Sequence, residues 1–150
     1  MSNIDIRPSG AADIPGLGLV LEDTQLFPAE LLPEMLDNPE GGIWLTALRD
    51  AEVVGLCYAR PEMLADGVWN MLALGVRTVA HGQAVGTALV ADLETRLRAD
   101  GVRMMIVETS DTSDFAQARG FYVARGYAQE ALIRDYWEAG DDKVIFRKLL

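Results

Sequence analysis

The first third of the chain combines one alternating segment with apolar residues at helical spacing. Residues 4–8, IDIRP, alternate between apolar and polar side chains, which predicts a first strand that ends at Pro8. Residues 13–36 predict two short helices that are separated near the sequence FPAE. Pro28 lies at this break, and proline suits a first helical turn because its missing N–H would have no partner there anyway.

Three longer apolar runs follow and predict strands. Residues 42–50, GIWLTALRD, and residues 52–61, EVVGLCYARP, meet at Asp50 and Ala51, so we expect a tight hairpin. A third long strand is expected at residues 68–76, VWNMLALGV, after the turn EMLADG. The middle of the chain is therefore expected to supply the centre of a sheet.

The strongest helical pattern begins at residue 85. An apolar stripe with a spacing of four residues consists of Val85, Leu89, Leu93 and Leu97. Acid-before-base pairs at i,i+4 are expected on the other side of this helix: Asp92 with Arg96 and Glu94 with Arg98. Gly101 is a typical residue to end it.

Residues 104–109, MMIVET, form a short apolar run typical of a strand that is buried on both faces. The order of strand, helix and buried strand predicts a parallel pair joined by a right-handed crossover. The topological break of the sheet is therefore expected between the third long strand and residues 104–109.

The end of the chain predicts a second helix and two strands. Asp114 and Gln117 have the spacing of a helix cap, and the helix is expected to run to Arg125 and stop at Gly126. The strands are expected in ALIRDYW and KVIFRKLL, on either side of the turn EAGDD. The fold class is mixed α/β with a central sheet.

Length and composition indicate one globular domain, residues 1–150, large enough for its own core. The formal net charge of −10 argues against nucleic acid or an anionic membrane as a partner. No apolar run reaches the roughly 20 residues that span a bilayer, and no signal peptide is apparent, so we expect a cytoplasmic protein. The single cysteine, Cys57, lies in an apolar run and is expected in the core.

The acidic residues are unevenly distributed along the chain. The segment from residue 20 to residue 40 has no Lys or Arg and six acids: Glu22, Asp23, Glu30, Glu34, Asp37 and Glu40. These carboxylates either form a solvated surface or produce a field that attracts a cationic substrate.

Residues 81–90, HGQAVGTALV, place two glycines between a strand and a long helix. A helix N-terminus has unpaired N–H groups and a partial positive charge, and glycines let an anion approach the backbone closely. The pattern is neither the dinucleotide fingerprint nor a P-loop. A diphosphate site and a plain helix start are both compatible with the spacing alone.

Two motifs in this region resemble those of the GNAT superfamily of acyl-CoA-dependent N-acetyltransferases. The sequence HGQAVG is similar to the family's motif Gln/Arg-x-x-Gly-x-Gly/Ala, which opens a long helix after a strand that ends in Val. ARGFYVARGYAQE is similar to a second family pattern, in which Ala118, Phe121, Tyr122, Gly126 and Tyr127 are in register. The resemblance covers residues 68–150 well, whereas the first 60 residues agree only in the order of elements.

Three residues depart from the family's pattern. His81 replaces Gln or Arg and is either a neutral residue on the loop lip or a cation that contacts the pyrophosphate. Ala84 replaces the first glycine, which should be tolerated if its φ is negative. Phe115 stands where the family often has Asn, and its ring is a candidate for packing against the pantetheine arm.

The resemblance implies a mostly antiparallel sheet of about seven strands, flanked by about four helices, with a parallel pair splayed around the acyl-CoA site. It implies direct transfer of an acetyl group from acetyl-CoA to a primary amine, without a metal. The residues expected to bind the cofactor are Leu74, Gly75, Val76, His81, Gly82, Gln83, Ala84, Val85, Gly86, Thr87 and Phe115. A backbone N–H near Leu74 would stabilise the oxyanion.

Tyr122 matches the position of the family's general acid, and a phenol suits this role because it stays protonated at neutral pH. The alternative interpretation of Tyr122 is an aromatic residue of the core or of the cleft wall. For the general base, Glu108, Glu22 and Asn70, acting through a water, remain candidates. Candidates to line the acceptor side are Asp135, Tyr136 and Trp137, which are otherwise plain sheet residues.

The acceptor is expected to be a small-molecule or peptide amine, and the acidic segment favours a cationic one. A non-catalytic acetyl-CoA sensor and a purely structural interaction domain are the alternatives. A homodimer is compatible with exposed edge strands.

Overall fold

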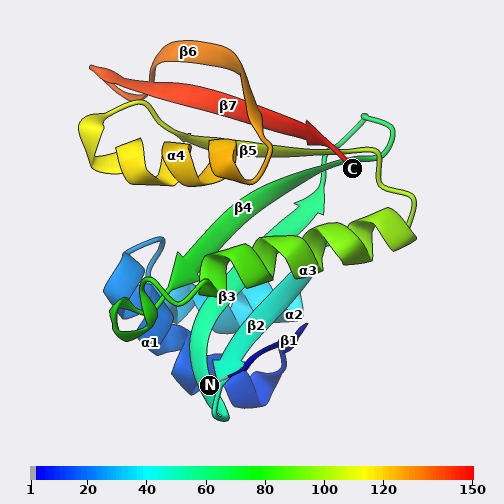
Figure 1. Cartoon of the computed structure of the whole chain (residues 1–150), viewed down its shortest axis with the longest axis vertical. Helices are drawn as coiled ribbons and strands as arrows, with labels where there is room; N and C mark the ends of the chain where they lie inside the picture. The colour runs from blue at the N-terminus through cyan, green and yellow to red at the C-terminus, as the bar shows by residue number, and fades with distance from the viewer. Residues whose placement is uncertain (1–2) are drawn as a thin grey trace.

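The computed structural model describes residues 3–150, and these form a sheet with helices on both faces (Figure 1). The strands are β1 (Ile4–Pro8), β2 (Ile43–Arg49), β3 (Glu52–Pro61), β4 (Val68–Val76), β5 (Met104–Ser110), β6 (Ala128–Glu138) and β7 (Asp141–Leu149). The helices are α1 (Ile14–Thr24), α2 (Leu32–Asp37), α3 (Val85–Ala99) and α4 (Ala116–Ala124). Four short 3₁₀ turns are η1 (Ala11–Asp13), η2 (Ala29–Leu31), η3 (Thr78–Ala80) and η4 (Ser113–Phe115). Within the described residues, the expected seven strands and four helices are confirmed.

The strand order is β1-β2-β3-β4-β5-β7-β6, and only β4 and β5 run parallel. They pair over three residues each, ending at Asn70 and Ile106. Just beyond Asn70, the register between β3 and β4 shifts: Ala59 opposes Met71, but Tyr58 opposes Ala73. Leu72 is therefore an extra residue in β4. Such a bulge bends the strand. The predicted break between the third long strand and β5 is therefore confirmed.

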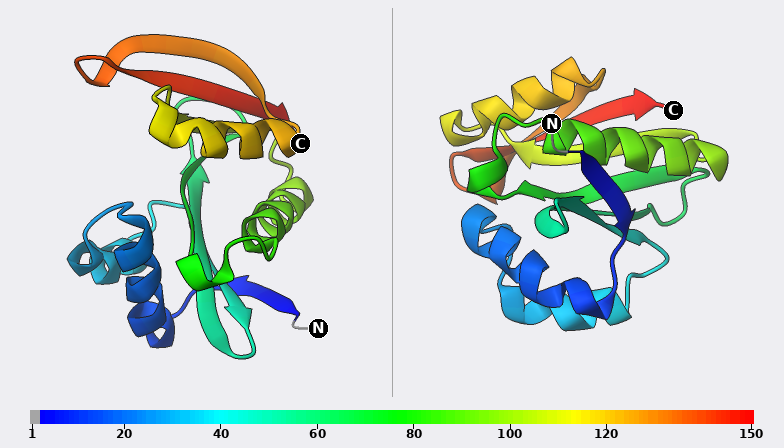
Figure 2. Two further views of the ribbon diagram at one scale, coloured as in Figure 1. Left: turned by 60° about the vertical axis from the view of Figure 1, so that its left-hand side comes forward. Right: turned by 60° about the horizontal axis from the view of Figure 1, so that its bottom comes forward.

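Helices α1 and α2 cover one face of the sheet, and α3 covers the other (Figure 2). The face under α3 packs the apolar stripe of that helix against Met105 and Phe146, both almost completely buried. Cys57 belongs to this core with no exposed surface, and burial raises the pKa of its thiol to about 12. The expectation that Cys57 is a core residue is confirmed.

Local turns follow the sequence in most places. The hairpin between β2 and β3 turns at Asp50 and Ala51, which both have a positive φ, as a tight two-residue connection requires. Pro28 stands in extended conformation directly before the η2 turn that leads into α2. The break expected between the two N-terminal helices is confirmed.

Two details of the helices differ from expectation. No side chain caps α4: a 3₁₀ turn begins at Ser113, and the N-cap position of α4 is Phe115, so the cap predicted from Asp114 and Gln117 is wrong. Glu94 is buried. Its carboxylate accepts hydrogen bonds from the Tyr127 hydroxyl at 2.8 Å and from the Lys148 ammonium at 2.9 Å, which compensate for the loss of water. The ion pairs of α3 therefore do not all lie on its exposed side.

Candidate active site

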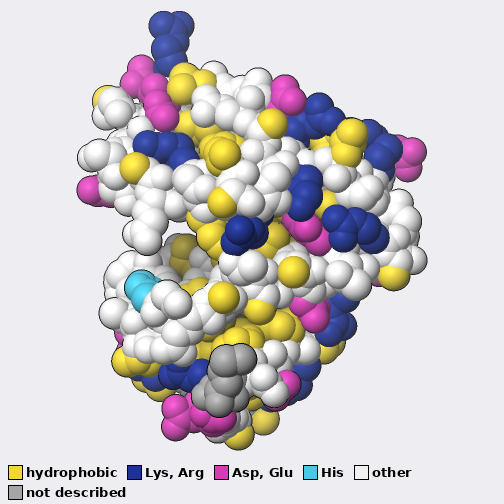
Figure 3. Space-filling view, viewed as in Figure 1, with side chains coloured by type: hydrophobic (Ala, Val, Ile, Leu, Met, Phe, Trp, Pro, Cys, Tyr) yellow, Lys and Arg dark blue, Asp and Glu magenta, His cyan; other side chains and the backbone are white. Residues whose placement is uncertain are grey.

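A cavity of about 620 Å³ opens along β4 where that strand separates from β5. We call it the β4–α3 cleft. Residues 74–76 have no partner strand on this edge among the described residues, so their backbone groups there are available to a ligand, apart from the Val76 carbonyl oxygen, which accepts from His81. Figure 3 shows the hollow, with the single histidine of the chain in cyan on its rim.

Most of the predicted cofactor residues line this cleft. They are Leu74, Gly75, Val76, His81, Gly82, Ala84, Val85, Gly86 and Thr87. Gln83 and Phe115 do not line it, and the Phe115 side chain is 45% exposed. The proposed packing of Phe115 against a pantetheine arm therefore has no support from the shape of the cavity.

The loop between β4 and α3 contains two residues with left-handed backbone. Gly82 has a φ of +78° and Ala84 a φ of +62°, so the condition of a negative φ, under which alanine should be tolerated at position 84, is not met. In this region the Cβ atom comes close to the following carbonyl oxygen, which costs an L-residue other than glycine roughly 1–2 kcal/mol. The loop thus keeps its shape with alanine at a cost in stability.

His81 is exposed on the lip of the cleft, the position given by the first of the two interpretations above. Its Nε2–H donates to the backbone carbonyl oxygen of Val76 at 3.2 Å, which ties the loop back to the end of β4. Contact of His81 with a pyrophosphate stays a prediction.

Gly86, at the start of α3, lies against α4. A Cβ atom at this position would lie 3.4 Å from the edge of the Phe121 ring, which forms part of the cleft wall. The Arg125 guanidinium donates to the Thr87 hydroxyl and lies 5.4 Å from the centre of the Phe121 ring. These contacts fix the two helices on either side of the cleft.

Several residues of the cleft were missed by the sequence analysis. They are Asp23, Thr24, Leu26, Ala80, Asp114, Gln117, Ala118 and Phe121. Phe121 was noted for the motif but not as a binding residue. Gly75 was the available signal for the contribution of α1, since glycine within a strand often marks a close approach. A Cβ atom there would lie 3.0 Å from Leu26 and 3.1 Å from Thr24.

Asp23 connects α1 to the loop that follows β4. Its carboxylate accepts the Thr78 backbone N–H at 2.9 Å and a longer hydrogen bond from Arg77 at 3.4 Å. The backbone hydrogen bond from Thr78 lowers the pKa of Asp23 below its usual range. An ionised carboxylate therefore stabilises the edge of the cleft near its mouth.

Tyr122 lies in α4, lines the cleft and packs against an aromatic cluster. Its ring centre is 5.5 Å from that of Phe121, 6.1 Å from that of Tyr127 and 5.9 Å from that of Phe146. Burial raises the pKa of the Tyr122 hydroxyl to about 12. Within residues 3–150 this hydroxyl has no hydrogen-bond partner. The phenol is thus neutral at pH 7 and free to donate.

Two of the three candidate bases lie together. The Asn70 side-chain amide donates to Glu108 at 3.1 Å and to Glu62 at 2.9 Å, and Glu108 also forms an ion pair with Lys143. Burial lowers the pKa of Lys143, but its hydrogen bond and charge interaction with Glu108 outweigh this and raise the pKa overall. Glu22 is exposed on α1, and its side chain has no described partner.

Tyr136 and Trp137, near the end of β6, pack against the ammonium group of Lys143 and do not line a cavity. The Lys143 ammonium lies 4.0 Å from the centre of the Tyr136 ring and 5.9 Å from that of Trp137. The Trp137 indole donates to the Thr109 carbonyl oxygen at 3.3 Å. Asp135 caps the β6–β7 turn by accepting the Gly140 N–H at 2.8 Å. None of the three lines either cavity described here.

A second cavity, of about 320 Å³, lies between α2 and the strands β3 and β4. We call it the α2 pocket. Of the six acids between residues 20 and 40, only Glu34 and Glu40 line it. Asp23 lines the β4–α3 cleft, and the remaining three, Glu22, Glu30 and Asp37, line neither cavity. All six residues, including those at the cavities, are exposed. The acidic segment therefore combines a solvated surface with two carboxylates at a pocket.

A search of residues 3–150 finds no group of three or more His, Cys, Asp or Glu side chains placed to hold a metal ion. In the same part of the chain, the helices are too short or too polar to span a bilayer.

Comparison with known proteins supports the resemblance. Residues 18–127 match the model of the acetyltransferase (GNAT) family. The mycothiol acetyltransferase of Sanguibacter keddieii is 36% identical over 94 residues, a match that covers 60% of this chain but only 29% of that relative's length. A GNAT-family structure from Desulfovibrio desulfuricans has a TM-score of 0.90 and 25% identity, and the match covers 98% of this chain and 99% of that one.

More distant structures share the fold. The ribosomal-protein-alanine N-acetyltransferase of Brucella melitensis has a TM-score of 0.83 and 20% identity over 97% of this chain and 99% of that one. The aminoglycoside 6′-N-acetyltransferase of Enterococcus faecium has a TM-score of 0.81 and 19% identity over 97% and 96%. A family model that matches most of the chain and a neighbour that agrees over its whole length lead to one conclusion. The chain belongs to the acetyltransferase (GNAT) family.

Proposed function

We propose that the protein transfers an acetyl group from acetyl-CoA directly to a primary amine. The observation that carries this proposal is the β4–α3 cleft, where an unpaired strand edge, a helix N-terminus and the neutral Tyr122 phenol line one cavity. Two structural neighbours are named for reactions at amine groups, on a ribosomal-protein alanine and on aminoglycosides. These names support the class of acceptor.

The groups that line the cleft support its proposed role as the site of an acyl-CoA. The free edge of β4 at residues 74–76 offers backbone donors and acceptors to the amide groups of a pantetheine arm. The loop from His81 to Thr87 and the start of α3 offer N–H groups to a diphosphate. When bound, acetyl-CoA supplies a thioester as the acyl donor.

Tyr122 is the proposed proton donor to the departing thiolate. Its raised pKa means that the proton is lost only as the pH rises toward about 12, so the phenol is ready to donate over the whole physiological range. A backbone N–H near Leu74 is proposed to stabilise the oxyanion.

Glu108 is the carboxylate that we propose accepts the proton of the amine, through water. Asn70 opposes Arg60 across the β3–β4 ladder, so its side chain faces the side of the sheet that carries the α2 pocket. The hydrogen bond from Asn70 and the ion pair with Lys143 hold Glu108 on this side. Glu22 has no such contact and is the weaker candidate.

The test is thiol release from acetyl-CoA, followed with and without a mixture of primary amines. Amine-dependent release that Tyr122→Phe reduces supports the proposal. Tight binding of acetyl-CoA without amine-dependent release would instead favour a non-catalytic sensor.

A further inference from the structure

The α2 pocket and the β4–α3 cleft are neighbours along two segments of the chain. In the segment after α1, Leu26 lines the cleft and Phe27 lines the pocket. In β4, Ala73 lines the pocket and Leu74 lines the cleft. Consecutive residues thus line the two cavities, which lie next to each other at the segment after α1 and at the bulged part of β4.

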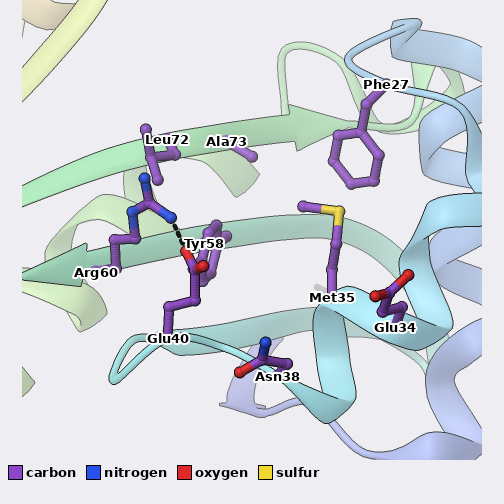
Figure 4. A pocket seen from close by; sticks show the side chains of 9 residues that line it. All are labelled: Phe27, Glu34, Met35, Asn38, Glu40, Tyr58, Arg60, Leu72 and Ala73. Carbon is purple, nitrogen blue, oxygen red and sulfur yellow. Dashed lines mark hydrogen bonds and ion pairs between the residues drawn. The ribbon is translucent and has the colours of Figure 1, made fainter.

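The walls of the α2 pocket are largely apolar. Phe27 comes from the segment after α1, Met35 from α2 and Leu72 from β4. Figure 4 shows Phe27 directed toward the Met35 side chain. Tyr58 lines the floor, where Trp44 stacks on its ring with the ring centres 4.6 Å apart. The Tyr58 hydroxyl donates to the Pro39 carbonyl oxygen at 2.8 Å. The pocket therefore offers hydrophobic contacts to the body of a ligand.

The charges around the pocket leave one carboxylate without a partner. Glu40 forms an ion pair with Arg60, as the dashed line in Figure 4 shows. Glu34 has neither a hydrogen bond nor an ion pair to its side chain in the part of the chain that the structure describes. The pocket therefore has a net charge of −1, which attracts one cation, and its only guanidinium is already neutralised.

We propose that the α2 pocket binds the acyl acceptor and selects a small primary amine with an apolar body, one positive charge and no carboxylate group. This inference rests on the function proposed above. Glu34 attracts the ammonium form of the amine into the pocket, while Phe27, Met35 and Leu72 surround the apolar part. A substrate carboxylate would meet Glu34 and Glu40 and find no free cation.

The transfer itself balances without a further reactant. The C–S bond of the thioester breaks and a C–N bond forms between the acetyl carbon and the amine nitrogen. Before the transfer, the ammonium form of the amine loses one proton to solvent. As the C–N bond forms, the nitrogen gives a second proton through water to Glu108, and the departing thiolate takes one proton from Tyr122. Glu108 then releases its proton to solvent and Tyr122 regains one from solvent, so that both residues return to their starting forms.

The test compares acceptors that differ in a single group, using the full-length protein and acetyl-CoA. 2-Phenylethylamine and phenylalanine share the ring and the amine, but only phenylalanine has a carboxylate. We expect kcat/KM to be at least about tenfold higher for 2-phenylethylamine, and Glu34→Gln to raise its KM by about tenfold with little change in kcat or in acetyl-CoA affinity. Glu30→Gln, an exposed acid outside the pocket, is the matched control and should change neither constant.

The possible failures are distinguishable. Equal or better use of phenylalanine, or an unchanged KM in Glu34→Gln, would overturn the assignment of the pocket while amine acetylation stands. Acetylation of an alanine-terminated peptide in preference to both small amines would also overturn it. If no amine increases thiol release at all, the proposed function fails, and the pocket assignment fails with it.

Discussion

The two cavities on either side of β4 are built from different parts of the chain. The β4–α3 cleft depends on backbone: a strand edge without a partner, left-handed residues in a loop, and glycine at the start of a helix. The α2 pocket depends on side chains such as Phe27, Glu34 and Arg60, which are far apart in sequence. Backbone geometry restricts which residues are allowed at fixed spacings, whereas a side-chain pocket can vary without changing the fold. If the α2 pocket binds the acceptor as we propose, this difference would let one fold accommodate different acceptors.

The largest effect is expected from Tyr122, the side chain that we propose as the proton donor. Tyr122→Phe removes the phenol and keeps the ring among Phe121, Tyr127 and Phe146. We expect kcat to fall by about 10²-fold or more, while the dissociation constant of acetyl-CoA changes little. Steady-state kinetics and calorimetry measure the two quantities. An unchanged kcat would exclude Tyr122 as the proton donor.

A change at the cleft wall should affect cofactor binding and leave the α2 pocket intact. In Gly86→Val the new side chain would point at the Phe121 ring, which a single Cβ atom already reaches at 3.4 Å. We expect the affinity for acetyl-CoA to fall by about tenfold or more. Gly120→Val is the matched control, because a Cβ atom there meets nothing within 4 Å. If both variants bind acetyl-CoA like the wild type, the wall at Gly86 does not contact the cofactor.

The pH dependence of kcat tests the protonation state of Tyr122. Because burial raises the pKa of the phenol to about 12, its proton is lost only as the pH rises through that value. We therefore expect no alkaline decrease in kcat up to about pH 10. A decrease with a midpoint near pH 9 that is absent from Tyr122→Phe would show that the phenol ionises far more easily than its surroundings indicate.

The smallest expected effect concerns the stability of the loop. Ala84→Gly removes a Cβ atom from a left-handed residue and should increase the free energy of unfolding by about 1 kcal/mol. Ala91→Gly, at an exposed position inside α3, should decrease it by about 1 kcal/mol. Urea denaturation of both variants measures the difference. A loss of stability in Ala84→Gly would mean that the loop does not hold Ala84 in this conformation.

The contrast between local backbone patterns and long-range side-chain contacts also determines what the sequence can predict. The strand at residues 68–76, the α3 stripe and the glycine-containing loop follow local rules of spacing, so the order of elements and the parallel pair could be predicted from the pattern. The cofactor residues were predicted only from the resemblance to the GNAT family. The left-handed φ of Ala84 could not be predicted, since alanine disfavours it and only the surrounding structure enforces it. The buried position of Glu94 depends on Tyr127 and Lys148, which are 33 and 54 residues away in sequence.

The α2 pocket, which we propose as the acceptor site, is the part that local patterns could not reveal. The sequence shows that the segment between residues 20 and 40 is rich in acids. It does not show that Glu34 lines a pocket, because this depends on the position of α2 against β3 and β4. The pairing of Glu40 with Arg60 is likewise a long-range contact. Which carboxylate keeps its charge free for a ligand therefore follows from tertiary structure alone.

The most direct test of the central claim is calorimetric titration of the purified protein with acetyl-CoA, beside an adenosine nucleotide that lacks the pantetheine arm. If the edge of β4 and the loop before α3 bind the two ends of the cofactor, acetyl-CoA will bind tightly and the nucleotide much more weakly. Equal affinities would show that the free edge of β4 contributes nothing. Absence of binding by acetyl-CoA would contradict the assignment of the β4–α3 cleft altogether.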